Sequence, residues 1–373
     1  MSGIYIHVPF CKRKCLYCAF YSVALLSRKQ DYLDALHCEI EQTLDYLPGR
    51  EIDTLYFGGG TPTLLTINEI ERILTKIRRY YHLNPDGEFT IEANPEQLSK
   101  SYLQDLLSLG LNRISIGVQS FNDDTLRFLG RRHNAEEALE AINLAASTGF
   151  DNISVDLIYG ISHRKPGEWE ADLHVATGLP ISHLSCYALT KEENTLLWRK
   201  IYRHELPDMD EDLANREFHQ LLSWCREHGF EQYEISNFAR NGMISKHNSA
   251  YWERKPYLGL GPSAHSFNGH SRQWNVSDLQ QYIDDIASGN SSGESETLSL
   301  NDQYNEYVML GLRTAKGINL AQIAELFGEK YRQHAEGQVQ KVNTNHYHRI
   351  GDSIVLTDEG KFFADGIAEQ LFN

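Results

Sequence analysis

The chain has 373 residues, of which 41% are hydrophobic and 23% charged, and this is ordinary for a globular protein with one large and one smaller domain. Its formal net charge of −16 argues against sequence-independent binding to nucleic acid, which needs a basic surface. The sequence contains no apolar run of about 18 residues that could span a membrane, and no secretory signal pattern. Free cysteines without such a signal predict a cytoplasmic location.

Short runs of β-branched and aromatic residues recur through the first half of the chain and alternate with helical patterns. The predicted strands cover 3–9, 53–60, 88–95, 113–120, 152–160 and 183–190. Helical patterns lie between them at 27–47 and 134–147, and the second begins with Asn134 and Glu137 in a capping-box-like arrangement. This alternation predicts an α/β fold with a parallel sheet, either a barrel or an open doubly wound sheet.

The alternation of strands and helices ends near residue 190. A stretch rich in glycine and aromatic residues follows at 229–275, and SGNSSGESE at 288–296 resembles a linker. Beyond it, helical patterns with a small β ribbon predict a compact domain that resembles a winged helix. We therefore predict an α/β domain with a β extension at 1–290 and a winged-helix-like domain at 297–373.

Three of the six cysteines, Cys11, Cys15 and Cys18, follow the first predicted strand within eight residues. Three is an odd number and the other cysteines are scattered singly, so disulfide pairing is a poor explanation. The spacing CxxxCxxC supplies three thiolates to a four-iron, four-sulfur cluster and leaves one iron open to a small molecule. A zinc site with a fourth ligand such as His7 and a set of structural thiols are the alternatives.

Polar residues and glycines lie at matching places on the first five predicted strands. They are Tyr5 on the first, Gly58–Thr61 at the end of the second, Glu92 and Gln119 late in the third and fourth, and Asp156 within the fifth. Taken singly, an acidic residue at a strand end is more often a helix cap, and GGGTP is most often a tight turn. Because ligands gather at the carboxyl ends of strands in α/β proteins, five such strands favour a binding site on one face.

These motifs resemble a known family. CxxxCxYC after a first strand and GGGTP after a second are similar to the radical S-adenosylmethionine (SAM) superfamily, whose fold is a partial (β/α)6 barrel. YIHVPFCKRKCLYC, YFGGGTPT, IEANPE, SIGVQSFN and VDLIYG resemble the oxygen-independent coproporphyrinogen dehydrogenase group. The resemblance covers nearly the whole chain, including the C-terminal domain.

The resemblance implies a set of cofactor-binding residues. Cys11, Cys15 and Cys18 would ligate a [4Fe–4S] cluster whose open iron chelates the amino and carboxylate groups of SAM. Positions that match SAM contacts are Tyr5, Tyr17, Gly59 and Glu92. Positions that match a second SAM site in the porphyrinogen enzyme are Gly60, Thr61, Gln119, Arg131 and Asp156. These residues have other uses in a barrel, so the second SAM is left open.

Two departures from the dehydrogenase pattern favour its heme chaperone branch. The enzymes carry a fourth cysteine two residues after the third, where this chain has Phe20, and they carry an N-terminal segment ahead of the residue that matches Tyr5. We therefore expect a chaperone that binds heme and delivers it to apo-hemoproteins, without dehydrogenase activity. The alternative is oxidative decarboxylation of coproporphyrinogen III by a SAM-derived radical. An enzyme acting on nucleic acid, suggested by the winged-helix-like tail, is disfavoured by the charge. A homodimer and a peripheral membrane contact are left open.

HNSAYW at 247–252 matches the HNxxYW motif associated with heme binding in the chaperones. Its His247 is the candidate axial ligand, and Trp252 offers a flat apolar face on a predicted exposed loop. A loop histidine with no ligand role is the ordinary alternative in a chain with sixteen histidines. His265, His346 and His348 are the competing ligands, and because CxxCH is absent we expect no c-type attachment of heme. We expect the heme site to be separate from the cluster site.

Overall fold

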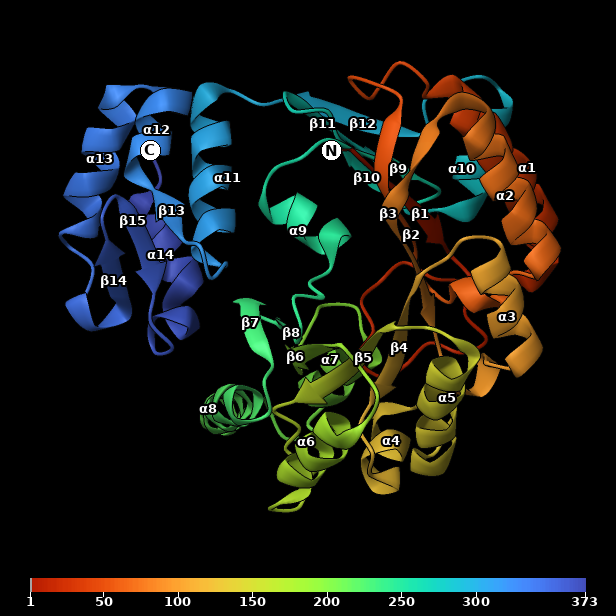
Figure 1. The fold of residues 1–373 in the computed structure, drawn as a ribbon, viewed down its shortest axis with the longest axis horizontal. Coiled ribbons are helices and arrows are strands. Elements are labelled where there is room, and N and C mark those ends of the chain that lie inside the picture. Colours follow the sequence, from red (N-terminus) through yellow and green to blue (C-terminus); the bar gives the residue numbers. More distant parts are fainter. Residues whose placement is uncertain (1) are drawn as a thin grey trace.

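The computed structural model describes residues 2–373. Six parallel strands in sequence order form the centre of a twelve-stranded sheet (Figure 1). They are β1 (Gly3–Val8), β2 (Glu51–Gly59), β3 (His82–Ala93), β4 (Arg113–Gln119), β5 (Asn152–Tyr159) and β6 (His183–Ala188). The predicted parallel α/β sheet is confirmed. The third strand begins six residues earlier than predicted, because its first residues pair with the start of β2 before the register shifts.

Helices cover the outer face of this sheet, as Figure 1 shows. They are α1 (Lys29–Gln42), α2 (Ile67–Tyr80), α3 (Lys100–Ser108), α4 (Asp123–Leu129), α5 (Ala135–Thr148) and α6 (Glu168–Gly178). The predicted capping box begins α5: the Asn134 side chain accepts from the Glu137 amide, and the Glu137 carboxylate accepts from the Asn134 amide. Each bond satisfies an amide that the first helical turn leaves without a partner.

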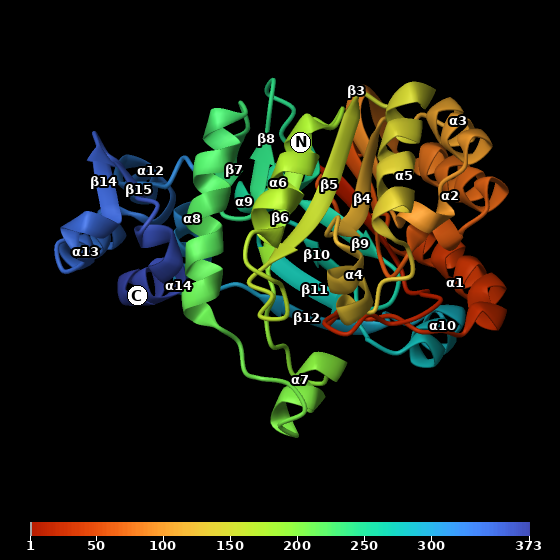
Figure 2. The same cartoon turned by 90° about the horizontal axis from the view of Figure 1, so that it is seen from below.

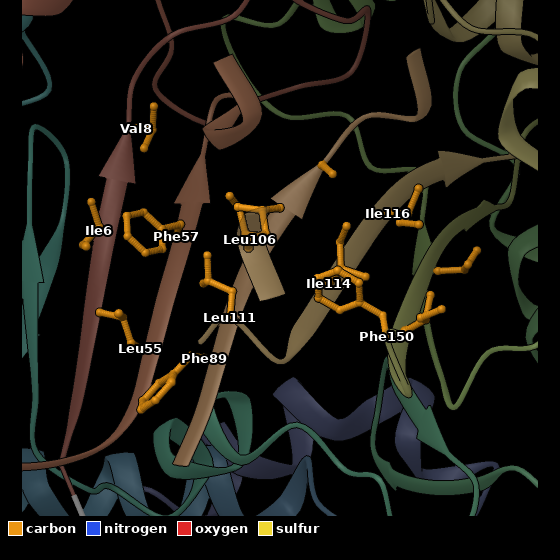
Figure 3. Close-up of a cluster of buried hydrophobic side chains, with 14 of the residues drawn as sticks. Ile6, Val8, Leu55, Phe57, Phe89, Leu106, Leu111, Ile114, Ile116 and Phe150 are labelled. Atoms are coloured by element: carbon orange, nitrogen blue, oxygen red, sulfur yellow. The ribbon is translucent and has the colours of Figure 1, made fainter. Parts of the chain in front are cut away.

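The period of two along each strand separates an apolar face from a polar one. On β1, Ile4, Ile6 and Val8 are fully buried toward the helices, while Tyr5 and His7 occupy the alternate positions. Figure 3 shows the apolar face packed with side chains from strands and helices, among them Ile6, Leu55, Phe57, Ile114 and Leu106. The alternate positions on the inner face carry Thr54, Tyr56, Glu88, Glu92, Arg113, Ser115, Ser154 and Asp156. The fold therefore collects polar side chains inside the curved sheet.

The stretch at 229–275 extends the sheet at both edges. On one side β9 (Tyr257–Leu260) runs parallel to β1, and β10 (His265–Phe267), β11 (Ser271–Asn275) and β12 (Gly293–Thr297) follow in antiparallel order. On the other side, β8 (Asn237–Ala239) pairs with β6, and β7 (Glu231–Glu234) forms the edge. The β extension was predicted to end at residue 290, and β12 lies beyond that boundary.

The segment predicted as a linker at 288–296 is half strand, which is a correction. β12 pairs with β11 along its length, from Ser271 opposite Thr297 to Asn275 opposite Gly293. Edge pairing uses backbone groups, so it needs none of the apolar residues on which sequence patterns depend. A Cβ at Gly293 would lie 1.8 Å from the Trp274 carbonyl oxygen, so this close approach requires glycine.

Four further helices connect these strands: α7 (Leu196–Tyr202), α8 (Glu211–Glu227), α9 (Lys246–Trp252) and α10 (Leu279–Ala287). α7 projects from the body of the molecule (Figure 2). α9 lies on the concave side of the sheet, opposite the outer helices (Figure 1). The HNSAYW motif is therefore helical, and its prediction as a loop is wrong. The Ser245 side chain caps the helix by accepting from the Asn248 amide.

The C-terminal segment builds its own core around Tyr304, Val308, Leu312, Ile323 and Ile354. Its elements are α11 (Leu300–Leu312), β13 (Ile318–Asn319), α12 (Leu320–Phe327), α13 (Glu329–Val339), β14 (Tyr347–Ile350), β15 (Ser353–Leu356) and α14 (Ala364–Leu371). The first three of these helices and the three-stranded sheet, in the order α11, β13, α12, α13, β14, β15, resemble a winged helix, and α14 follows them. The separate core supports the proposed boundary near residue 297. Across residues 2–373, no helix combines the length and the apolar character that crossing a bilayer requires.

Candidate functional site

The loop after β1 carries Cys11, Cys15 and Cys18, all half-buried. Backbone hydrogen bonds hold it at both ends and in the middle: the Cys11 amide donates to the Val23 carbonyl at 3.0 Å, and the Leu16 amide donates to the Leu129 carbonyl at 3.1 Å. Burial raises the pKa of the Cys11 and Cys18 thiols, and the charges of neighbouring cysteines add to the rise. The three sulfur atoms therefore lie close enough to influence one another.

A chain of polar contacts links two of these cysteines through side chains that follow β2, β3 and α4. The Cys11 sulfur lies 3.1 Å from the Thr61 hydroxyl, to which the Asn94 amide donates at 3.3 Å. The Arg131 guanidinium donates to the Asn94 side-chain oxygen at 2.6 Å and to the Cys15 sulfur at 3.6 Å. A guanidinium beside a sulfur atom favours the thiolate, which is the form that binds metal. Asn94 was missed in the sequence, although it lies in the IEANPE motif.

The donor set fits an iron–sulfur cluster in its chemistry, because three thiols on one partly exposed loop lie beside a cation. Within residues 2–373, no three His, Cys, Asp or Glu side chains are placed to hold a single metal ion. A cluster does not require such convergence, since each cysteine binds a different iron. His7, the candidate fourth zinc ligand, uses both ring nitrogens elsewhere: Nδ1 lies 3.1 Å from the Tyr5 hydroxyl, and Nε2 lies 2.9 Å from the Tyr21 carbonyl.

Glu92 lies on the inner face of β3, where two groups of β2 reach its carboxylate. The Tyr56 hydroxyl donates to it at 2.8 Å and the Gly59 amide at 3.2 Å. Burial outweighs these hydrogen bonds and raises the pKa of Glu92 to about 7. The Tyr5 ring stacks on that of Tyr56 at 6.0 Å. Tyr56 was not predicted from sequence, because a tyrosine on a strand is ordinarily a packing residue.

Gly59 has a structural requirement of its own. Its φ of +106° lies in the left-handed region, and a Cβ there would meet the His7 ring at 2.8 Å. A Cβ at the next residue, Gly60, would meet the Phe10 carbonyl oxygen at 2.6 Å. The GGGTP turn must therefore be glycine to pass the first strand closely, independently of any ligand.

Gln119 and Asp156 are the remaining polar residues predicted on the first five strands. Gln119 ends β4 with a φ of +73°, where the pairing with β5 shifts register, and such strain in a non-glycine residue is common at functional sites. Its side-chain amide and the Arg131 guanidinium both lie within 3.4 Å of the point where a Cβ of Gly117 would stand. Asp156 accepts from the Ser115 hydroxyl at 3.1 Å, and burial raises its pKa.

Tyr17 lies next to this group, half-buried on the cysteine loop. Burial raises its pKa, and the Arg131 guanidinium opposes that rise. The structure thus brings the cysteine loop and the predicted strand-end residues together. Arg131 lies on one side of this group and Glu92 on the other.

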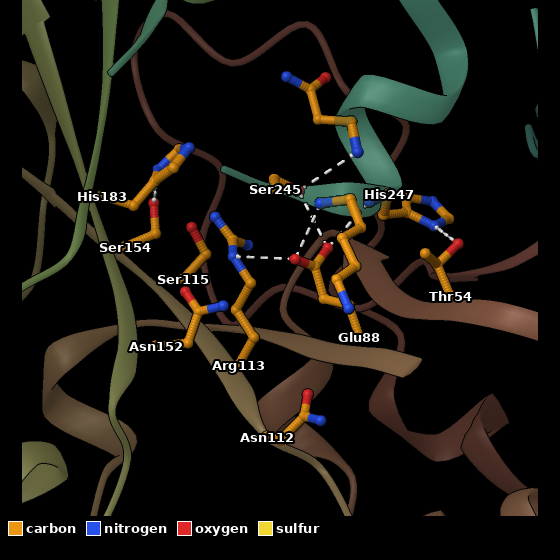
Figure 4. Close-up of polar contacts among 12 residues, drawn as sticks. Thr54, Glu88, Asn112, Arg113, Ser115, Asn152, Ser154, His183, Ser245 and His247 are labelled. Carbon is orange, nitrogen blue, oxygen red and sulfur yellow. Dashed lines mark hydrogen bonds and ion pairs between the residues drawn. The ribbon is translucent and has the colours of Figure 1, made fainter. Parts of the chain in front are cut away.

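His247 was predicted on an exposed loop, and the structure places it on the helix α9. It is 3% exposed, on the buried side of α9 (Figure 4). Its Nδ1 lies 2.8 Å from the Thr54 hydroxyl, and its Nε2 lies 2.8 Å from the Tyr251 hydroxyl, so both ring nitrogens have partners. Burial lowers the pKa of His247 to about 3, which keeps the ring neutral. The predicted exposure of His247 is therefore wrong, while its role as an axial ligand stays a prediction. Trp252 is half-buried.

The heme candidate His247 lies beside residues of the SAM candidate. The expected separation of the heme site from the cluster cysteines stays a prediction. The His247 ring stacks on Tyr56 at 5.0 Å and on Tyr5 at 6.5 Å. The competing histidines lie farther along the chain: His265 is exposed and stacks on Trp274 at 6.1 Å, while His346 stacks on Phe363 in the C-terminal domain.

Comparison with known proteins agrees with the fold and the motifs. A model of the radical SAM superfamily matches residues 5–176, and a model of the HemN C-terminal domain matches residues 298–363. The heme chaperone HemW of Bacillus subtilis is 34% identical over 98% of this chain and 98% of its own, and that of Mycobacterium tuberculosis is 34% identical over 99% and 94%.

Among solved structures, the coproporphyrinogen III oxidase HemN of Escherichia coli, a radical SAM enzyme, superposes with a TM-score of 0.87. The match covers 100% of this chain and 90% of that one, at 24% sequence identity. The likeness confirms the predicted radical SAM fold with its C-terminal domain.

Proposed function

The chain belongs to the family of the HemW heme chaperones, within the radical SAM superfamily, and on that premise we propose that it binds heme and delivers it to apo-hemoproteins. The single observation that carries the proposal is the full-length likeness to these chaperones, joined to a cysteine loop that ends without a fourth thiol. The position two residues after Cys18 is Phe20, whose side chain is 69% exposed.

We propose that Cys11, Cys15 and Cys18 hold a [4Fe–4S] cluster, which when bound supplies an open iron and one-electron chemistry. The residues around them support this assignment. Arg131 keeps a positive charge beside Cys15, and Thr61 offers a hydrogen bond to the Cys11 sulfur. Both contacts orient the sulfur atoms before any cluster is inserted.

We propose that SAM binds beside the cluster, against Tyr5, Tyr17, Gly59 and Glu92. Glu92 supports this site because a carboxylate on the inner face suits a ligand with an amino group and a sulfonium. Binding of a second SAM stays a proposal. The residues that would contact it are Gly60, Thr61, Gln119, Arg131 and Asp156. The contacts of Thr61 and Arg131 with cysteine sulfurs favour instead a role for these two in holding the cluster loop.

The heme site is the part of the proposal that the motif alone supports. For His247 to ligate iron, one ring nitrogen would have to leave its partner, Thr54 or Tyr251, and the buried ring would have to become accessible. Trp252 carries a buried indole nitrogen without a hydrogen-bond partner, so movement of this helix would cost it no such bond. We therefore propose heme binding for the protein and leave its iron ligand unassigned.

One anaerobic sample tests the proposal, together with Cys15→Ala as its matched variant. Reconstituted protein should carry about four irons, bind heme with the absorption spectrum of a ligated iron porphyrin, and show no decarboxylation of coproporphyrinogen. Cys15→Ala should remain folded by circular dichroism and lose the cluster. Vinyl formation from coproporphyrinogen would replace the chaperone with an enzyme, and zinc at full occupancy without iron uptake would remove the cluster.

A further inference from the structure

We propose that α9 is an internal support for the SAM-side residues of the barrel, and that His247 is a positioning residue that holds Tyr56 and, through it, Glu92. The HNxxYW segment would then act on the cofactor side of the protein rather than as an exposed heme ligand. This inference rests on the proposed SAM site, and it adds His247 and Tyr56, which no motif match assigns to that site.

The first step is the attachment of α9 to the sheet, shown in Figure 4. The buried Glu88 carboxylate of β3 accepts from the Ser245 hydroxyl at 3.1 Å and from the amides of Lys246 and His247, both at 2.9 Å. Arg113 on β4, equally buried, lies 3.9 Å from the same carboxylate. A buried charge is tolerated only when it is paired and hydrogen-bonded, so the first turn of α9 is fixed in place.

The second step is the orientation of the His247 ring. Thr54, fully buried on β2, holds one nitrogen, and Tyr251, one helical turn later, holds the other. The ring cannot rotate without losing a hydrogen bond in a site closed to water, which is costly. Its plane lies 23° from that of Tyr56 and 28° from that of Tyr5. Stacked pairs of this kind fix the position of both rings.

The third step connects the His247 ring to Glu92. Tyr56 lies between His247, on which it stacks, and Glu92, to which it donates a hydrogen bond at 2.8 Å. Removing the imidazole would leave a cavity against one face of Tyr56, into which the phenol ring would shift. The hydroxyl would then leave the Glu92 carboxylate, and only the Gly59 amide would remain to stabilise its charge from β2.

A measurement on Glu92 itself tests the inference without SAM or cluster. The titratable and hydrogen-bonding groups around its carboxyl are Tyr56 and the Gly59 amide on β2, Arg113 on β4, Asp156 on β5, Tyr5 on β1 and Tyr251 on α9. The Tyr56 hydrogen bond favours the ionised form, so its loss should move the pKa of Glu92 upward. Carbon-13 titration of labelled glutamate, assigned with Glu92→Gln, should show this upward shift in His247→Ala and equally in Tyr56→Phe. An unchanged titration in His247→Ala would overturn the inference.

SAM binding gives the second readout. In reduced, reconstituted protein, His247→Ala should weaken SAM binding at least about tenfold, the scale of one hydrogen bond to a charged group, while iron content and fold stay unchanged. His247→Gln keeps a flat amide with a donor and an acceptor and should recover part of the affinity. His265→Ala, at an exposed ring beside Trp274, is the control and should match the parent in SAM affinity and in the Glu92 titration. Weaker heme binding with unchanged SAM affinity and Glu92 titration would make His247 a heme ligand instead.

The two readouts separate failure of this inference from failure of the proposed function. If the parent protein shows no response to SAM, the proposed SAM site fails, and the Glu92 titration still decides whether His247 positions Tyr56. If SAM binds the parent, and His247→Ala has the same SAM affinity and the same Glu92 titration as the parent, the SAM site stands and the positioning role of His247 is wrong.

Discussion

Glu92 experiences two opposing influences on one carboxyl group. Burial disfavours its charge, while hydrogen bonds from Tyr56 and the Gly59 amide favour it, and the outcome is a pKa of about 7. Its charge therefore changes near neutral pH, far from the range of a free glutamate. In the proposed SAM site, the ionised form is the one that attracts a cationic ligand.

The expected result is a SAM affinity that rises with pH through about 7 in reduced, reconstituted protein. Below this value Glu92 is protonated and neutral, and above it the carboxylate is present. Glu92→Gln should weaken binding by a few kcal/mol at most, the range for truncating one charged partner, and should abolish this dependence. Spectral titration of the reduced cluster at several pH values is the measurement. A parent affinity that is flat across neutral pH would exclude Glu92 from the site.

At the scale of elements, α9 depends on a buried ion pair that is formed only by folding. Glu88→Ala would leave Arg113 buried without its partner and remove the acceptor for three donors at the start of α9. We expect a loss of about 3–5 kcal/mol in the free energy of unfolding, as for other broken buried pairs.

Denaturant unfolding of Glu88→Ala and of Glu253→Ala measures this difference. Glu253 pairs with Lys316 on the surface, and its removal should cost less than about 1 kcal/mol. Hydrogen exchange in α9 should also become faster in Glu88→Ala, because its first turn is released. Equal stability of the two variants would show that α9 does not depend on Glu88.

The same elements show what the sequence could and could not predict. The six parallel strands and the start of α5 follow from local patterns, namely side-chain periodicity and a cap within four residues. The position of α9 does not follow from a local pattern, because Glu88 and Ser245 lie 157 positions apart and meet only in the folded chain. HNSAYW is short, polar at its start and flanked by glycine-containing loops, so its pattern predicted an exposed loop.

The site was predicted unevenly for a similar reason. Motifs at strand ends pointed to Glu92, Gln119 and Asp156, which the parallel topology then brings to one inner face. Tyr56 and Asn94 link these residues to their neighbours, yet each looks like an ordinary strand or loop residue until its partner is known. The buried state of His247 was beyond reach because burial depends on tertiary contacts with β2 and β3.

At the scale of the whole molecule, the C-terminal domain is tied to the barrel extension through backbone contacts. The Ile235 amide donates to the Arg313 carbonyl and the Ala315 amide to the Tyr233 carbonyl, both at 3.0 Å. Asn248 of α9 donates to the Tyr233 hydroxyl at 3.4 Å, so this junction lies next to the HNxxYW helix. The contacts of Tyr233 with both Ala315 and Asn248 therefore place the start of the C-terminal domain beside α9.

The most direct test of the chaperone account is transfer of heme to an apo-hemoprotein. Reconstituted protein loaded with one heme is mixed anaerobically with apo-myoglobin, and the absorption of the acceptor is followed with time. The account predicts that the acceptor spectrum appears at the expense of the donor spectrum, and faster than heme leaves the donor into a heme-scavenging resin. Heme that stays bound to the donor, or that appears on the acceptor only at the rate of spontaneous release, would contradict it.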